Sequence, residues 1–214
     1  GYDGDGDGVD GSSKDLDQIN GCLEEWRRAF RIVVTSRDVF LCGVISGCFE
    51  SAMYIFVILW TPALTSGSSS SPPCGLIFST FMVCCMAGSC IFSCVATFAK
   101  KYMCWFFAFF ACVGSFSLSV PIWSTDISLR FFAFLVFEMI VGFYYPCIGT
   151  LKSQIVDGRA RSTIYNIFRI PLNLIVASVL LAHIDDIGVK FFIAASLLLF
   201  STFGCILLAY KLKD

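Results

Sequence analysis

The sequence predicts an all-α membrane protein with six transmembrane helices. Of its 214 residues, 57% are hydrophobic and only 14% are charged, whereas soluble domains carry about 25% charged residues. Six separate apolar runs are each long enough to cross the hydrocarbon core as a helix, which takes about 20 residues. These runs cover residues 39–60, 76–99, 102–123, 131–151, 164–181 and 189–209.

The chain opens with GYDGDGDGVDG, an acidic and Gly-rich stretch that partly matches a calcium-binding loop. Asp3, Asp5 and Asp7 have the spacing of the first three ligands, but Lys14 stands where the bidentate Glu is required. We therefore expect residues 1–13 to be a flexible tail without a bound metal. Because the first residue is Gly1 rather than Met, we also expect the chain to be a fragment of a longer protein.

We place a cytoplasmic tail at residues 1–37 and expect its second part to form an amphipathic helix. Asp15 and Gln18 form a plausible capping box at its start. Trp26 beside Arg27 and Arg28 suits a helix at a headgroup surface, and packing on a neighbouring soluble loop is an equally open alternative. Apolar residues recur at helical steps of three and four at Leu16, Ile19, Leu23, Trp26, Phe30 and Val33.

Lys and Arg are distributed unequally between the two sides of the expected membrane. The opposite side receives only Arg130 and Lys190. The positive-inside rule therefore places both termini in the cytoplasm. We expect a six-helix bundle over 38–210 and a short cytoplasmic tail over 211–214, and we take the plasma membrane as the location. The cytoplasmic side holds Lys14, Arg27, Arg28, Arg31, Arg37, Lys100, Lys101, Lys152, Arg159, Arg161, Lys211 and Lys213.

Most of the twelve cysteines fall inside the apolar runs, where they are expected to act as small packing residues. With one histidine and no C-x-x-C pair, the sequence offers no ligand set for a structural zinc ion. There is also no cluster of histidines and carboxylates for metal chemistry. We expect no cofactor, no enzymatic activity and no nucleic-acid partner.

Three ionisable residues interrupt the apolar runs, namely Glu50, Glu138 and Arg169. Each costs about 2.5–3.5 kcal/mol at mid-helix and needs a partner or a cavity. Ser162, Asn166, Arg169 and Asn173 follow one helical face. This stripe offers a guanidinium and amide donors, so it predicts an oxyanion site. Alternatively, Arg169 reaches the interface or pairs with Glu138 to hold two helices together.

The two acidic residues have two open interpretations. Glu50 lies one turn before Tyr54, and Glu138 lies two turns before Tyr145. Each carboxyl either exchanges a proton during transport or hydrogen-bonds a neighbouring helix. Pro146, like Pro171 after Arg169, is expected to bend its helix beside these polar groups.

Three stretches carry a family resemblance: ESAMYIFVILWTPAL from Glu50, FEMIVGFYYPCIGTLKSQI from Phe137 and RARSTIYNIFRIPLNL from Arg159. They resemble the molybdate-anion transporter branch of the major facilitator superfamily. The resemblance implies the C-terminal six helices of a twelve-helix carrier, with a missing N-terminal half as partner. It also implies alternating access and a small oxyanion substrate, with molybdate as the suspected one.

The resemblance further implies a gating role for Asp157, Arg159 and Arg161 in the loop before the fifth span, where a solvated basic loop is the simpler alternative. The superfamily's Gly-Asp-Arg-Gly type of signature is not retained in ATFAKKYM, which keeps only the charge of Lys100 and Lys101. Two other functions stay open. The chain could be a non-transporting membrane scaffold or regulator, or a carrier half for another small polar solute.

Overall fold

The computed structural model describes residues 8–65, 73–156, 161–182 and 186–211, with the backbone alone for residues 8–18 and 100. Within these ranges the chain is helical and contains no strand. The elements are α1 (Gly8–Thr35), α2 (Arg37–Thr65), α3 (Cys74–Phe98), the short 3-10 helix η1 (Lys100–Tyr102), α4 (Met103–Trp123), α5 (Ile127–Ile155), α6 (Arg161–Leu181) and α7 (Ile187–Lys211).

Helices α2 to α7 are the membrane-crossing elements. All six are long and apolar enough to span a bilayer. Each apolar run identified in the sequence coincides with one of these helices, and the ends differ by only a few residues. The prediction of an all-α membrane protein with six spans is therefore confirmed.

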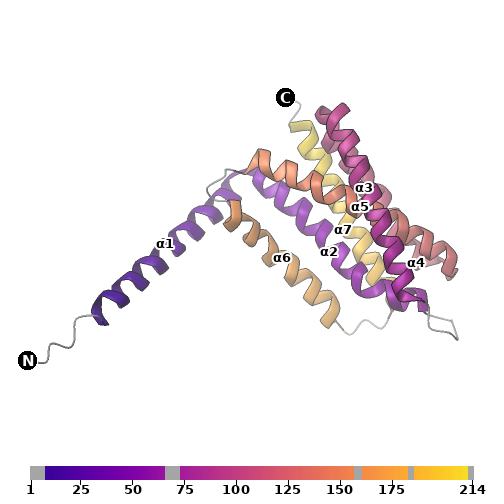
Figure 1. Cartoon of the computed structure of the whole chain (residues 1–214), viewed down its shortest axis with the longest axis horizontal. Coiled ribbons are helices and arrows are strands. Elements are labelled where there is room, and N and C mark those ends of the chain that lie inside the picture. Colours follow the sequence, from indigo (N-terminus) through magenta and orange to yellow (C-terminus); the bar gives the residue numbers. More distant parts are fainter. Residues whose placement is uncertain (1–7, 66–72, 157–160, 183–185, 212–214) are drawn as a thin grey trace, which may run out of the picture.

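The spans pack into a bundle from which α1 projects (Figure 1). The main contacts are between α4 and α7, α3 and α5, and α2 and α7, while α6 packs mainly against α2. Aromatic rings fill the core between α2, α4 and α5. Stacked or tilted pairs join Phe49 to Phe107, Phe137 and Tyr144, and an edge-to-face contact joins Phe56 to Phe137.

Two glycines bring α3 and α5 into backbone contact. A Cβ at Gly88 would overlap the Met139 carbonyl, and a Cβ at Gly142 would overlap the Cys85 carbonyl. Small residues allow such close approach between helices in lipid. By contrast, a Cβ at Gly47 would meet nothing within 4 Å.

A proline in α5 is compensated by a side chain of α3. Pro146 has no N–H, so the carbonyl of Gly142 loses its helical donor. The Ser89 hydroxyl of α3 donates to that carbonyl oxygen at 2.9 Å. Because an unpaired carbonyl is costly in an apolar bundle, Ser89 allows α5 to continue through Pro146.

Helix α1 begins at Gly8, earlier than the sequence pattern indicates. The capping box is therefore wrong, because Asp15 lies inside the helix and not at its start. An N-cap residue stands at the boundary of the helix that it caps, whereas Asp15 follows seven helical residues. Of the partial calcium loop, residues 1–7 lie outside the described residues.

The apolar side of α1 is only partly covered. Ala29 and Val33 are buried in a small cluster with α6 residues. Ile19, Leu23 and Phe30 are more than half exposed. The last turns of α1 therefore pack on α6. Contact of the exposed apolar side with lipid headgroups or with a soluble loop stays a prediction.

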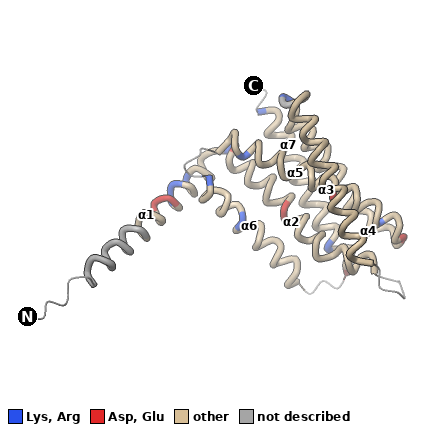
Figure 2. The backbone as a smooth tube through the Cα atoms, in the orientation of Figure 1, with Lys and Arg blue, Asp and Glu red and all other residues tan. Residues whose placement is uncertain are grey.

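Basic residues concentrate at one end of the bundle (Figure 2). This is the end at which α1 meets α2 and at which α7 finishes. At the same end, the Lys211 ammonium of α7 pairs with the Asp38 carboxylate at the start of α2.

Candidate functional site

A cavity of about 650 Å³ opens between α2, α5 and α6. Three charged side chains, three tyrosines and one asparagine share it with a few apolar residues. Since charges are costly within membrane helices, their convergence on one cavity marks it as the candidate functional site. Its lining comprises Glu50, Met53, Tyr54, Tyr145, Ile148, Gly149, Lys152, Tyr165, Arg169, Leu172 and Asn173.

An ion pair crosses the cavity from α2 to α5. The Lys152 Nζ lies 3.6 Å from Glu50 Oε1, and both side chains are largely shielded, with 12% and 21% of their surface exposed, respectively. The Tyr144 hydroxyl donates a hydrogen bond of 2.8 Å to the same oxygen. Glu50 therefore contacts α5 through a hydrogen bond and an ion pair, and its role stays a prediction.

The aromatic core positions Tyr144 for this contact. Its ring is fully buried and stacks on Phe49, with centroids 3.9 Å apart and planes 5° apart. Phe49 directly precedes Glu50 in α2. The stack therefore links the packing of the core to the direction of the Glu50 side chain.

Further polar contacts line the same cavity. The Tyr145 hydroxyl donates to the Met53 sulfur at 3.1 Å. The Lys152 ammonium lies 5.1 Å from the centre of the Tyr165 ring, within the range of a cation–π contact. Lys152 is thus shared between a carboxylate on α2 and an aromatic face on α6.

Arg169 faces this cavity from α6 and is exposed. Among the described residues, no hydrogen bond or ion pair engages its guanidinium. In particular, the alternative pairing with Glu138 is not present there. The guanidinium thus keeps its donors available to a group entering the cavity.

The predicted polar stripe on α6 is only partly assembled at the cavity. Asn173 lines the cavity with Arg169, but Ser162 and Asn166 are exposed elsewhere on the helix. Ser162 lies about 10 Å before Arg169 along the axis, at 1.5 Å per residue. Asn166 points to a neighbouring side of the helix, because each residue turns about 100°. The stripe therefore does not act as one unit in this structure.

Glu138 lies apart from the cavity. It is 6% exposed, and Cys84 and Cys85 of α3 are within its electrostatic reach. Tyr145 follows it two turns later and lines the cavity. The two acidic residues that the sequence treats as equivalent therefore occupy different environments.

The structure describes only part of the predicted gating loop. Asp157 and Arg159 lie outside the described residues. Arg161 at the start of α6 donates to the carbonyls of Ser153 and Val156, both at 3.3 Å. In this structure Arg161 therefore satisfies the last carbonyls of α5, a common role for a basic residue at a helix end.

Sequence reasoning missed Lys152, Tyr144 and Tyr165 as site residues. Lys152 was assigned to the cytoplasmic loop by the charge count, although it lies seven residues after Tyr145 on the same side of the helix. That spacing of two turns is the signal that identifies it. Tyr144 carries no such signal, since a buried tyrosine in an apolar run resembles any core aromatic.

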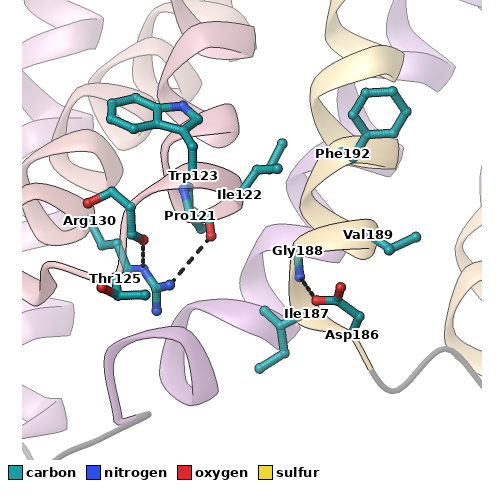
Figure 3. Close-up of a pocket in the computed structure, with 11 residues that line it drawn as sticks. Pro121, Ile122, Trp123, Thr125, Arg130, Asp186, Ile187, Gly188, Val189 and Phe192 are labelled. Atoms are coloured by element: carbon teal, nitrogen blue, oxygen red, sulfur yellow. Dashed lines mark hydrogen bonds between the residues drawn. The ribbon is translucent and has the colours of Figure 1, made fainter.

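A second cavity, of about 480 Å³, lies at the opposite end of the bundle near the starts of α5 and α7 (Figure 3). Arg130 donates there to the carbonyls of Ser124, Ala63 and Pro121, at 2.7, 2.9 and 3.4 Å. These carbonyls close the last turns of α2 and α4. The guanidinium is therefore engaged in holding helix ends together, which makes this cavity a weaker candidate.

In the described part of the chain, no group of three or more His, Cys, Asp or Glu residues is arranged to hold a metal ion. The candidate site between α2, α5 and α6 instead combines two cations, one carboxylate and neutral donors. Such a set can hold a small anion by charge and hydrogen bonds together.

Known proteins share part of this sequence. A family described as sugar transporters with 12 transmembrane segments matches residues 11–143. The molybdate-anion transporter of Danio rerio is 33% identical over 179 residues, which is 77% of this chain and 36% of that protein. The one from Xenopus tropicalis is 33% identical over 190 residues, or 81% of this chain and 40% of that protein.

The chain thus spans well under half the length of these relatives. No solved structure shows significant similarity to it. The identity of about one third over more than three quarters of this chain nevertheless shows the family. The chain therefore belongs to the molybdate-anion transporter branch of the major facilitator superfamily.

Proposed function

We propose that this chain is the C-terminal half of a twelve-helix carrier that moves a small oxyanion, with molybdate as the first candidate. The observation that carries the proposal is the cavity in which Lys152, Arg169 and Asn173 converge. Two cations and an amide supply donors suited to the oxygens of a tetrahedral anion. The relatives named molybdate-anion transporters support this choice of anion.

The cavity requires a second half to become a transport pathway. Tyr54 and Tyr145 at its lining are 46% and 50% exposed, and Val57 and Ile58 beside them on α2 are also exposed. A second six-helix half placed over this side would enclose the anion between the two halves. Rocking of the halves would then open the cavity to each side of the membrane in turn.

The charge distribution supports one orientation. The basic end of the bundle would face the cytoplasm, together with α1 and the end of α7 (Figure 2). The plasma membrane is the proposed location, since a carrier of an external nutrient anion acts there.

A carrier half for another small polar solute is the second candidate. It is favoured by one observation, the match to a family described as sugar transporters. The three tyrosines and Asn173 of the cavity offer hydrogen bonds that would also suit a neutral solute. Lys152 and Arg169 favour an anion over a neutral solute, because only an anion is attracted by their positive charge.

Uptake of radiolabelled molybdate in transporter-deficient cells tests the proposal. The chain is compared with a version extended upstream by a second six-helix half, with membrane insertion measured for both. Uptake by the extended form alone supports a carrier built from two halves. Failure of both forms to take up molybdate or compete with it, despite normal insertion, would favour another solute or a non-transporting scaffold.

A further inference from the structure

Five large apolar residues of α1 lie exposed in one row along the helix. Their spacing of four, three, four and four residues keeps them on one side of an α-helix. Each of them is between 39% and 65% exposed. A contiguous exposed apolar surface of this kind marks a site of interaction with a partner or a membrane. The row, which we call the apolar stripe, consists of Ile19, Leu23, Trp26, Phe30 and Val34.

The apolar stripe adjoins the part of α1 that packs on the bundle. Ala29 and Val33 are buried in a cluster with residues of α6. Around the helix they lie directly beside Trp26 and Phe30, at about 100° per residue. Helix α6 is itself long and apolar enough to span a bilayer, and its Leu174 is exposed. The stripe therefore lies next to the lipid that surrounds the bundle.

Helix α1 does not continue the path of α2 through the bilayer. Only Ser36 separates the two helices, and it donates to the Ile32 carbonyl at 2.9 Å and accepts from the Phe40 N–H at 3.0 Å. From this junction α1 nonetheless runs in a different direction, away from the bundle (Figure 1). The junction lies at the basic end of the spans (Figure 2). Because spans end near the headgroups, α1 lies at the headgroup level of one leaflet.

Two exposed arginines border the stripe. Arg27 and Arg31 lie closer to its middle than Glu24 and Glu25 do, at about 100° per residue. A guanidinium binds phosphate oxygens well, and its apolar stem can lie along buried lipid chains. Trp26 has the amphipathic ring that is favoured at the same boundary. This combination of apolar, aromatic and cationic groups is complementary to lipid phosphates above acyl chains.

We propose that α1 lies in the headgroup boundary of the bilayer that α2 to α7 span. The apolar stripe faces the acyl chains, and Arg27 and Arg31 bind lipid phosphates. The occupant of the stripe is thus lipid, rather than a second copy of this chain or a second six-helix half. Because Ala29 and Val33 pack on α6, the lipid contact also anchors the start of α6. The assignment does not depend on which solute the carrier moves.

Fluorescence of Trp26 tests the proposal, with the full chain in nanodiscs of phosphatidylcholine. Trp60→Phe, Trp105→Phe and Trp123→Phe together leave Trp26 as the only tryptophan. Bromine, which quenches tryptophan, is placed on the lipid chains either near the headgroup or near the chain ends. An interfacial helix lies about 5–10 Å into the boundary. Shallow bromine should therefore quench Trp26 more strongly than deep bromine does.

Two glutamate variants on opposite sides of α1 provide the comparison. Leu23→Glu places a charge in the stripe, so it should remove most of the quenching and shift the emission to the red. Gly21→Glu places the same charge on the opposite side, where a Cβ meets nothing within 4 Å, and should keep the quenching. Amide hydrogen exchange of residues 19–34 repeats the comparison in the chain with all four tryptophans. Exchange should be faster in Leu23→Glu alone.

Quenching that is lost in Leu23→Glu and kept in Gly21→Glu supports the lipid contact. A water-exposed, unquenched Trp26 would overturn it, and so would equal losses in the two variants. Trp26 shielded from both water and lipid would also overturn it, in favour of a second copy as the occupant. Quenching that disappears when the chain is extended upstream by a second six-helix half would assign the stripe to that half instead. None of these outcomes changes the oxyanion proposal, which uptake tests separately.

Discussion

The ring of Tyr144 lies flat against the ring of Phe49, with centroids 3.9 Å apart, and its hydroxyl reaches Glu50. One residue therefore serves the core with its ring and the cavity with its oxygen. The two roles can be separated by substitution. Several other contacts of this bundle also allow a matched pair of variants.

Tyr144→Ala should destabilise the protein much more than Tyr144→Phe. The alanine variant removes a fully buried ring, a change that costs about 3–5 kcal/mol. The phenylalanine variant keeps the stack and loses one hydrogen bond to a charged group, worth about 1.5–3 kcal/mol. Thermal unfolding in detergent measures the difference, and equal melting temperatures for the two variants would contradict the stacking role.

Arg169→Ala should lower molybdate uptake by about 10–100-fold at normal insertion, because an unengaged guanidinium is removed from the cavity. Arg169→Lys should recover part of the activity through its charge. Ser178→Ala on the same helix is the control, since this hydroxyl bonds only the carbonyl of Leu174 among the described residues. Unchanged uptake in Arg169→Ala would rule out its role as an anion ligand.

Asn173→Ala should reduce uptake more than Asn166→Ala. Asn173 lines the cavity and Asn166 does not, whereas the sequence stripe gives them similar weight. Losing one neutral hydrogen bond to the anion corresponds to about 3–10-fold in affinity. Concentration-dependent uptake of the two variants distinguishes the positions, and equal losses would favour the stripe over the cavity.

Gly142→Ala should destabilise the bundle by about 1–3 kcal/mol, because the added methyl overlaps the backbone of α3. Gly47→Ala is its control. A Cβ at Gly47 meets nothing within 4 Å, so this variant should gain up to about 1 kcal/mol from helix propensity. Melting temperatures that move in the same direction for both variants would contradict the close contact of α3 and α5.

Arg130→Ala should lower stability by about 2–4 kcal/mol, since three carbonyls at the ends of α2 and α4 lose a charged donor (Figure 3). Arg130→Lys should restore only part of this, because one ammonium cannot reproduce the fork of a guanidinium. Lys190→Ala, at the same end of the bundle, provides the comparison. A melting temperature for Arg130→Ala as high as that of Lys190→Ala would argue against the clamp.

The spans could be predicted from the sequence because burial in lipid imposes a length and an apolar composition on each helix. The family was recognisable because long stretches such as RARSTIYNIFRIPLNL resemble it. The early start of α1 was not predictable from apolar spacing, because its first residues are polar and Gly-rich. Helix ends depend on local capping and dipole terms that the apolar pattern does not report.

The site was predictable in part. Arg169 and Glu50 were found because charge in an apolar run is costly wherever the helix packs. Which residues join them depends on how α2, α5 and α6 are rotated against one another. That rotation brings Lys152 and Tyr165 to the cavity and leaves Glu138 and Asn166 outside it, and a single helix pattern contains no information about it.

Locating a bound anion tests the central claim most directly. The molybdenum atom scatters strongly, so its anomalous signal in crystals of the complete protein with molybdate marks the binding position. A peak within contact distance of Lys152 and Arg169 between α2, α5 and α6 is the predicted result. A peak elsewhere, or none in a protein that still takes up molybdate, would contradict the assignment of this cavity as the anion site.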